Sequence, residues 1–492
     1  MSRRGRTSSL RVRLGQGAAV LSALGIGVVA CADDPANQGI VEDVGVDAGP
    51  DVSADAGKDP GKDTDADVDA FVPTPDDAGA VDGAFDPSNE PVTCTGTPCA
   101  TELVAGEKHF CARMSDSTVR CWGADFLGAL GGAAGNASAL DGGAIKVGTV
   151  VGLGSVTQIS AAGSTTCARL SDGGVQCWGD NRYAQLGLEV DPAVVDDDWH
   201  PTPAPVALDQ AATRVDVGHG TVCAVLSSTE LVCWGRDDAA QLALSDAPEG
   251  RRNPVRGPGR IAIDPLVLTR TAPGSTTVLG LNGLGELWTW GGVAGSEGVL
   301  AGRVATLSPD PSPKRVDTLT KVTSFSASVS IDPDPTEGPG EGSPKPPPIA
   351  HACAIANGEV YCWGRSPAGA LCTGLPDPET VPRKAPFSAK TWPQQVAVAD
   401  EITCARMTDG SVYCCGSDTR GRLGTGTVGT VSSVLTKASA FTRRAVQVAT
   451  SDHSVCALVK DGTVECWGSN ENGELGKTPD TQAHPTPSKI VF

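Results

Sequence analysis

The stretch TCARLSDGGVQCWG, residues 166–179, recurs in related forms along the chain and predicts its fold. Apolar and polar residues alternate on both sides of Ser171-Asp172-Gly173, a pattern typical of a β-hairpin. If these three residues form the turn, Cys167 faces Cys177. Directly opposed residues of an antiparallel ladder have Cα atoms about 4.5–5.5 Å apart, which suits a disulfide. We therefore predict a hairpin that is closed by a disulfide.

The same spacing predicts further hairpin disulfides. Cysteines recur with the same ten-residue step at Cys111–Cys121, Cys223–Cys233, Cys404–Cys414 and Cys456–Cys466. Cys353 and Cys362 are nine residues apart, but Asn357-Gly358 between them is a two-residue turn signal, so they still face each other. One copy has Leu279 and Thr289 at the two positions. The joint loss of both cysteines is expected if the two residues are bonded.

The copies are regularly spaced. Each ends in a Trp-Gly pair or a replacement of it, at Trp122, Trp178, Trp234, Trp290, Trp363, Cys415 and Trp467. Successive copies are 56, 56, 56, 73, 52 and 52 residues apart. One four-stranded unit of this size cannot bury both faces of its sheet, so neighbouring units must stack. Seven units closed into a ring leave only short, protected sheet edges.

The pattern Cys-Ala-x-x-x-Asp-Gly-x-Val-x-Cys-Trp-Gly-x-Asn-x-x-Gly-x-Leu-Gly resembles the repeat of the regulator of chromosome condensation family. Residues 456–476 match it best, and the resemblance covers about residues 101–492. It implies an all-β, seven-bladed β-propeller built from repeats of about 52–73 residues. Members of the family include a nuclear nucleotide-exchange factor and a secreted bacterial β-lactamase inhibitor. No contact residue of either protein can be matched to a position of this chain.

Two segments bear on how the ring closes. The chain ends in the apolar segment Pro487–Phe492, which is similar to Ala445–Ala449 before the last copy. We predict that this end strand completes the first blade and ties the ring shut. Between the fourth and fifth copies lies an insertion near Ser308–Pro348, which is either a binding loop or an expansion without a function.

The N-terminal residues predict export. Residues 1–30 combine a basic start with the apolar run Ala18–Ala30, as in a signal peptide. The small and apolar residues before Cys31 resemble a bacterial lipoprotein signal, in which that cysteine carries the lipid. An ordinary secretory signal with an incidental Cys31 and a core helix of a soluble protein are the alternatives. Export agrees with the predicted disulfides, which persist in oxidising compartments.

Residues 31–93 are predicted to be a disordered linker rich in Asp, Ala, Gly and Pro. Between residues 32 and 90 the chain has 17 acidic residues and two lysines, a net charge of −15. Such a segment buries too little apolar surface to offset its ordering entropy. It is interpreted as a tether that holds the folded domain off a membrane, with divalent-ion binding by Asp63–Asp69 as the alternative.

Four more cysteines lie outside the hairpins. Cys94 and Cys99 are expected to close a small loop where the linker meets the propeller of residues 94–492. Cys372 stands where a glycine ends the fifth copy, and Cys415 stands where the sixth copy should have Trp. We predict that Cys372 and Cys415 form a disulfide between adjacent blades, which replaces the packing of the tryptophan.

One acidic loop is the candidate binding site. It lies between the second and third copies and consists of Asp196, Asp197, Asp198, Trp199 and His200. Three carboxylates beside an imidazole suit a divalent ion, and an exposed Trp suits a glycan. A solvated acidic loop is the simpler alternative, and no metal site is predicted.

No arrangement typical of catalysis stands out in the sequence. His109 and His351 take the same place before the first cysteine of a copy, which favours a role in the core. The chain has no nucleophile elbow, phosphate loop or Cys-His-Asn pattern, so neither catalysis nor a cofactor is predicted.

Charge and export together narrow the function. The formal charge of −20 argues against a nucleic-acid partner, which requires clustered Lys and Arg. We predict a monomeric module that binds a protein or glycan, either secreted or anchored by a lipid on Cys31 to the outer membrane or cell surface. An inhibitor of a secreted enzyme is the alternative. A carbohydrate-active enzyme or a protein like a guanine-nucleotide exchange factor are further alternatives.

Overall fold

The computed structural model describes residues 91–132, 147–189, 193–243, 255–261, 263, 266–274, 276–292, 301–303, 309–328, 350–375, 378–388 and 390–492. All of them belong to Ala70–Phe492, the second of the two units into which the chain divides. The predicted signal peptide, Cys31 and the linker up to residue 90 lie outside the described residues.

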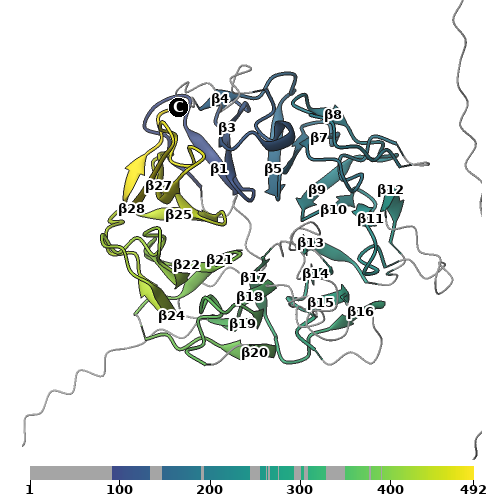
Figure 1. Ribbon diagram of the computed structural model, residues 1–492. Helices are drawn as coiled ribbons and strands as arrows, with labels where there is room; N and C mark the ends of the chain where they lie inside the picture. Colours follow the sequence, from purple (N-terminus) through teal and green to yellow (C-terminus); the bar gives the residue numbers. More distant parts are fainter. Residues whose placement is uncertain are drawn as a thin grey trace, which may run out of the picture. The chain divides into compact units, whose positions relative to one another are not determined.

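The described part of the chain forms seven four-stranded antiparallel sheets, the blades of a β-propeller (Figure 1). The strands of each blade follow chain order from the centre of the ring outwards. The inner strands are β1 (Ala100–Ala105), β5 (Val156–Ala162), β9 (Ala212–Val217), β13 (Leu268–Pro273), β17 (Val322–Ala327), β21 (Pro393–Ala399) and β25 (Ala445–Thr450). The second strands are β2 (His109–Met114), β6 (Thr165–Leu170), β10 (Thr221–Leu226), β14 (Thr277–Asn282), β18 (Ala350–Ala356), β22 (Ile402–Met407) and β26 (Ser454–Val459).

The third strands carry the Trp-Gly pairs, and the outer strands vary most in length. The third strands are β3 (Val119–Gly123), β7 (Val175–Gly179), β11 (Leu231–Arg236), β15 (Leu287–Gly291), β19 (Glu359–Arg365), β23 (Val412–Ser417) and β27 (Val464–Asn470). The outer strands are β4 (Gly148–Thr149), β8 (Ala204–Pro205), β12 (Val255–Arg260), β16 (Asp310–Arg315), β20 (Glu379–Lys384), β24 (Val431–Lys437) and β28 (Asp480–Lys489). This all-β, seven-bladed architecture is the fold that the sequence predicts.

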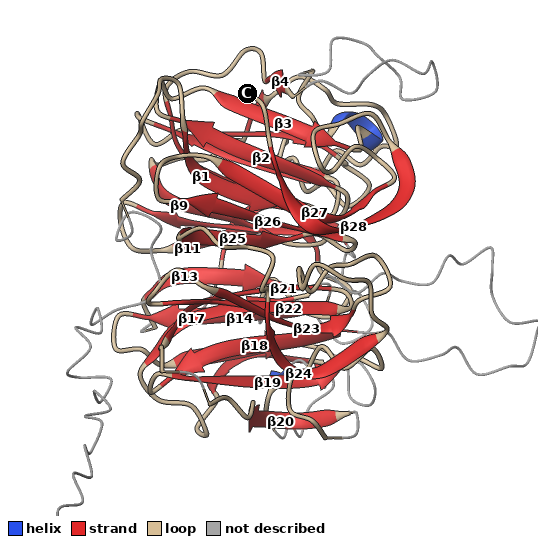
Figure 2. Ribbon diagram, turned by 90° about the vertical axis from the view of Figure 1, so that its left-hand side faces the viewer, coloured by secondary structure: helices blue, strands red, loops and turns tan. Residues whose placement is uncertain are grey.

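Seen from the side of the ring, the strands run between two faces on which the loops gather (Figure 2). The helical element of the described residues is a short 3-10 turn at Phe126–Gly128. None of the helices in the described residues has the length and apolar character needed to span a membrane.

The hairpin register is as predicted. Cys167 of β6 faces Cys177 of β7, and their Cα atoms lie 4.1 Å apart across the disulfide. The shorter turn at Asn357-Gly358 keeps Cys353 opposite Cys362. The other hairpin pairs and Cys94–Cys99 are also bonded. In the blade without cysteines, Leu279 faces Thr289 in the same register.

The hydrophobic core lies between the blades. Each disulfide faces the next blade, because adjacent residues of a strand point to opposite sides of its sheet. The Cys111–Cys121 disulfide of the first blade therefore packs with the fully buried Trp178 of the second. The same pairing of a disulfide with the Trp of the following blade recurs around the ring.

Each of these tryptophans also forms a hydrogen bond across the interface. The indole Nε1 of Trp178 donates to the carbonyl oxygen of Ala129 at 2.9 Å, just before Leu130 of the first blade. Equivalent bonds of 2.7–2.9 Å are made by Trp122, Trp234, Trp290 and Trp467. A buried indole N–H needs such a partner, so the bond fixes the position at which the ring of each Trp docks.

The sixth blade achieves the same contact without a tryptophan. Cys415 forms the predicted disulfide with Cys372 of the fifth blade, with their Cα atoms 5.5 Å apart. The missing indole donor is replaced by the Thr403 hydroxyl, which donates to the carbonyl oxygen of Ala370 at 2.8 Å. The backbone of Cys372 has φ 56°, in the left-handed region that glycine occupies at the equivalent Gly187, where φ is 62°.

The prediction for the C-terminus is wrong. The end strand β28 pairs with β27 of its own blade, so no strand is exchanged with the first blade. The similarity to residues 445–449 misled, because that segment is an inner strand whereas the chain ends in an outer one. Other contacts between the first and last blades close the ring: Phe492 packs edge-on against Trp122 with ring centroids 5.8 Å apart, and the backbone N–H of Thr93 donates to the carbonyl oxygen of Lys460 at 2.7 Å.

The bounds of the insertion also need correction. The first part of Ser308–Pro348 forms β16 and β17, which belong to the regular blades. The extra length therefore lies between β17 and β18, and residues 329–349 are outside the described part.

We predict that the paired substitution Cys372→Ala with Cys415→Ala lowers the free energy of unfolding by about 2–4 kcal/mol. A disulfide over this separation restricts the unfolded chain, and the sixth blade has no Trp to hold the interface in its place. Denaturant unfolding under non-reducing conditions measures the loss.

The matched control is Cys94→Ala with Cys99→Ala, which opens a loop of only five residues. We expect a smaller loss there, because a short loop constrains the unfolded chain less. Equal losses in the two variants would contradict the role given to Cys372–Cys415.

Candidate functional site

The inner strands of the seven blades surround a central channel, a cavity of about 580 Å³. Residues from every blade line it, and some of them are charged. Pro91 and Val92, where the described chain begins, also belong to the lining. A volume of this size is in the range of ligand pockets. The channel is therefore the first place to look for a functional site.

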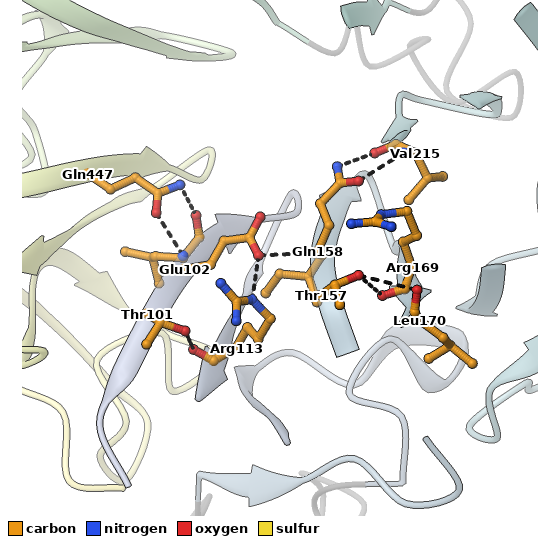
Figure 3. A network of polar contacts seen from close by, with 11 residues as sticks. Thr101, Glu102, Arg113, Thr157, Gln158, Arg169, Leu170, Val215 and Gln447 are labelled. Atoms are coloured by element: carbon orange, nitrogen blue, oxygen red, sulfur yellow. Dashed lines mark hydrogen bonds and ion pairs between the residues drawn. The ribbon is translucent and has the colours of Figure 1, made fainter. Parts of the chain in front are cut away.

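A β-bulge near the start of each of the seven inner strands turns side chains into the channel wall. In β1 the bulge falls at Thr101, and its hydroxyl donates to the carbonyl oxygen of Arg113 at 3.0 Å. Thr157 of β5 makes the same bond to the carbonyl oxygen of Arg169 at 3.1 Å. The next residue in each strand, Glu102 or Gln158, then faces the neighbouring blade (Figure 3).

These residues join adjacent inner strands. Gln447 accepts from the backbone N–H of Leu103 at 2.9 Å and donates to its carbonyl oxygen at 2.7 Å, which bonds the last blade to the first. Gln158 makes the same two bonds to Val215, and Gln395 makes them to Val448. Each of these glutamine carboxamides thus bonds to the backbone of the next inner strand, as a neighbouring strand would in a continuous sheet. The paired bonds keep adjacent inner strands in register.

One end of the channel carries the arginine mouth, defined as Glu102, Arg113, Arg169, Arg214 and Arg270 at the starts of the inner strands and the ends of the second strands. Arg113 Nε donates to Glu102 Oε2 at 3.0 Å. Burial raises the pKa of the Glu102 carboxyl, and the nearby Arg113 only partly opposes that shift. Arg214 pairs with Asp216 at 2.8 Å.

Arg169 differs from its neighbours (Figure 3). Its Nε is buried and has no hydrogen-bond partner within the described residues. Burial lowers the pKa of its guanidinium, the charge of Glu102 opposes that shift, and the charges of Arg214 and Arg113 add to it. Arg169 is therefore attracted by Glu102 without forming an ion pair with it, since Glu102 is paired with Arg113.

The opposite end of the channel carries the acidic mouth, defined as Glu107, Asp400, Glu401 and Asp452 just after the inner strands. Burial raises the pKa of Asp400 to about 6, and the charge of Glu401 adds to the shift. Burial likewise raises the pKa of Asp452 well above its ordinary value, with Glu107 and Asp400 contributing. Arg422 is buried beside them and pairs with Glu401 at 2.9 Å.

The predicted acidic loop has a structural core. Asp196 accepts hydrogen bonds from His200 Nε2 at 2.6 Å and from Asn181 Nδ2 at 2.9 Å. Burial alone would raise the pKa of Asp196, but these bonds outweigh it and lower the pKa. Asp197 and Asp198 remain exposed beside Trp199.

The same arrangement, an Asp that accepts hydrogen bonds from an Asn and a His, recurs in the last blade. There Asp480 accepts from Asn470 at 3.0 Å and from His484 at 2.9 Å. The bonds from Asn470 and then His484 lower the pKa of Asp480 to about 2. The recurrence indicates that Asp196 and His200 fasten the loop. Within the described residues, no group of three His, Cys, Asp or Glu side chains is arranged to hold a metal ion.

The two repeated histidines lie in the core. His109 Nε2 lies 2.9 Å from the Thr166 hydroxyl of the next blade, and burial lowers its pKa to about 4. His351 lies 2.8 Å from Thr403, and burial lowers its pKa to about 3. Both imidazoles are therefore neutral links between blades.

The sequence analysis missed the arginine mouth. A usable signal was present, because Arg113 and Arg169 both follow a Cys-Ala pair at the end of a second strand. Their convergence depends on the ring, which brings strands 56 residues apart next to each other.

Comparison with known proteins agrees with this geometry. Two family models, both described as the regulator of chromosome condensation (RCC1) repeat, match the chain. One matches residues 156–185, 394–422 and 445–474, and the other matches 357–406 and 409–458. The chain contains RCC1 repeats. The matched segments include the hairpins of blades two, six and seven and the third strand of blade five.

Curated relatives with RCC1 repeats match only in part. The ultraviolet-B receptor UVR8 of Arabidopsis thaliana is 33% identical over 145 residues, 29% of this chain and 32% of the receptor. The human E3 ubiquitin-protein ligase HERC2 is 38% identical over 85 residues, 17% of this chain and 2% of the ligase. The matches thus span a third or less of each relative.

Solved structures share the fold. Yeast RCC1 (Prp20), crystallised with Kap60, has a TM-score of 0.60 at 16% identity, covering 83% of this chain and 87% of that one. Human WBSCR16 has a TM-score of 0.56 at 16% identity, covering 75% and 94%. At such identities the likeness shows the fold alone.

We predict that Asp400→Asn stabilises the protein at pH 7.5. The raised pKa means that the folded state holds the Asp400 proton more tightly than the unfolded state does. Stability therefore falls as pH rises from about 4 to 6, and the substitution removes that loss. We expect a gain on the order of 1 kcal/mol, reduced by partial exposure, that disappears near pH 4.

Thermal unfolding between pH 4 and pH 8 measures the difference. Asp197→Asn, at an exposed carboxylate in the acidic loop, is the control and should show no such pH dependence. A destabilised Asp400→Asn variant at pH 7.5 would refute the assignment.

Proposed function

We propose that this chain is an exported, non-catalytic binding module whose propeller presents a fixed surface to a protein partner. The coarser part of this reading, an RCC1-type propeller suited to macromolecular interaction, follows from the fold. The observation that carries the rest is a cluster of exposed side chains on the loops of the first two blades.

We call this cluster the loop patch and define it as Phe126, Arg182 and Trp199. Phe126 and Trp199 are 54% and 52% exposed, unusual values for large aromatic side chains. The backbone N–H of His200 donates to the carbonyl oxygen of Leu127 at 3.1 Å, which brings the two aromatic residues to neighbouring positions.

Arg182 completes the patch. Its guanidinium lies 5.7 Å from the centre of the Phe126 ring, in cation–π geometry. Asp180, which is buried, pairs with Arg182 at 2.8 Å and holds it in that position. Aromatic residues and arginine dominate the energetic centres of protein interfaces. Because Phe126 and Arg182 already contact each other, these two side chains lose little conformational entropy on binding.

Export is the second part of the proposal. The eight disulfides of the described residues would persist in an oxidising compartment, which supports the signal that the sequence predicts. We propose that the mature chain is held at the cell envelope by a lipid on Cys31, or is secreted if that cysteine is not modified. A protein partner in the same compartment is then accessible to the loop patch.

The loop patch is tested by photocrosslinking in intact cells of the native host. A photoreactive residue at Val195, which is 47% exposed beside the patch, should capture a partner at saturable yield. Phe126→Ala with Trp199→Ala should reduce the yield at least tenfold, because two energetic centres of about 1–2 kcal/mol each together exceed one factor of ten in affinity.

The control places the photoreactive residue at Leu284, an 80% exposed side chain in the fourth blade. Equal capture at both positions, or capture unaffected by the paired alanine substitution, would rule out the patch. If polysaccharide is captured and protein is not, the partner of the loop patch is a glycan.

Lipidation makes a separate prediction. Expressed in a Gram-negative host, the full chain should sediment with membranes. Cys31→Ala should move it to the soluble fraction, because the acyl chains attached at Cys31 supply the membrane anchor. Mass spectrometry of the N-terminal peptide identifies the modification. An unmodified Cys31 in membrane-bound protein would overturn the anchor.

A further inference from the structure

The geometry of the channel points to a second site: we propose that the arginine mouth binds the carboxylates of an acidic peptide. This site is separate from the loop patch and does not depend on it. Three observations support it: the charges of the mouth, the donors of Arg169, and the position of Pro91 and Val92 in the cavity lining.

The first argument is the balance of charge. Four arginines, Arg113, Arg169, Arg214 and Arg270, line the cavity from the first four blades. The two carboxylates placed among them, Glu102 and Asp216, are 6% exposed and are each held by their own arginine. Even if both are ionised, Arg169 has no paired carboxylate among the described residues, because the Glu102 that attracts it is paired with Arg113. Guanidinium groups lined up around a low-dielectric cavity favour a bound anion.

The second argument is the state of the donors. Arg214 is occupied by Asp216, and Arg270 lies 5.0 Å from the centre of the Phe325 ring. Arg113 uses its Nε on Glu102. The guanidinium of Arg169 makes no hydrogen bond or ion pair within the described part of the chain. A half-buried arginine that forms no ion pair is costly, so its place is explained by a ligand that supplies a carboxylate.

The chemistry of the ligand follows from the donors. The planar fork of a guanidinium matches a carboxylate with two parallel hydrogen bonds. The channel wall adds the backbone of the inner strands, which suits a peptide. The acidic mouth at the other end repels such a peptide, so it can bind only from the arginine side.

Two sources can supply these carboxylates. One is an acidic segment of a partner protein. The other is this chain: residues 76–90 contain five acidic residues and no Lys or Arg, and they directly precede Pro91 and Val92 of the cavity lining. Both sources offer the same ligand, the carboxylates of an acidic segment, and the experiment below separates them.

The test uses the full chain and a labelled synthetic peptide with the sequence of residues 76–90. Fluorescence anisotropy at low ionic strength measures binding. We expect saturable binding that weakens with salt and is absent for a peptide in which Asn and Gln replace all five acidic residues. Arg169→Gln should weaken binding about tenfold, the size of effect expected for one charge-assisted bidentate contact.

Two controls keep the result interpretable. Arg260→Gln removes an arginine of the outer strand β12, far along the blade from the channel, and should leave binding unchanged. Because the guanidinium of Arg169 forms no hydrogen bond within the described residues, Arg169→Gln should also unfold at the same temperature as the parent protein or higher. Unchanged binding by the folded Arg169→Gln variant would overturn the proposal. It would also be overturned if neither the parent chain nor the variant described below bound the peptide.

The source is read from a full chain with Asp76→Asn, Asp77→Asn, Asp82→Asn, Asp86→Asn and Glu90→Gln. If the chain supplies its own carboxylates, this variant binds the peptide several-fold more tightly, because an internal competitor is removed. If the site receives only a partner, the variant and the parent bind alike. Both results support the site, and no peptide binding by either chain contradicts it.

Discussion

The structure depends on one interaction between neighbouring blades: the disulfide of one hairpin lies beneath the tryptophan of the next blade. Cys177 and Trp178 are adjacent in β7, so they project to opposite faces of the sheet and serve two different interfaces. One faces the third blade, and the other docks on the first. Each blade that has both a hairpin disulfide and this tryptophan is thus fixed on both sides by two consecutive residues of a single strand, while Leu279 and Thr289 take the place of the disulfide in the fourth blade.

This arrangement explains how the sixth blade tolerates its exception. When Trp is replaced by Cys415, both functions of the tryptophan still have to be met. The Cys372–Cys415 disulfide fills the volume, and the Thr403 hydroxyl supplies the donor for the carbonyl oxygen of Ala370. The interface is conserved as a set of contacts, although the residue types change.

A scaffold fixed in this way leaves its loops and its channel free for binding. The inner strands are held in register by carboxamide bonds such as that from Gln447 to Leu103. The charged side chains around the channel therefore occupy defined positions. The loop patch is likewise held by Asp180 and by backbone bonds, and both surfaces are prepared before a ligand arrives.

The sequence pattern predicted the features that depend on residues close together in the chain. The hairpin register and the disulfides follow from spacing within about ten residues, and Cys372–Cys415 follows from two matching departures in adjacent repeats. Ring closure was predicted wrongly, because the position of a strand within its blade depends on where the chain enters the ring. The arginine mouth was missed for the same reason: Arg113 and Arg169 meet only once the ring has closed.

The most direct test of this account maps the disulfides in protein exported by its native host, with free thiols alkylated before digestion. The account predicts one linked peptide pair containing Cys167 and Cys177, with neither residue carrying the alkyl label. The same should hold for the equivalent pairs of the other hairpins. If Cys167 and Cys177 were both alkylated, the covalent closure of the blades and the exported location inferred from it would both be contradicted.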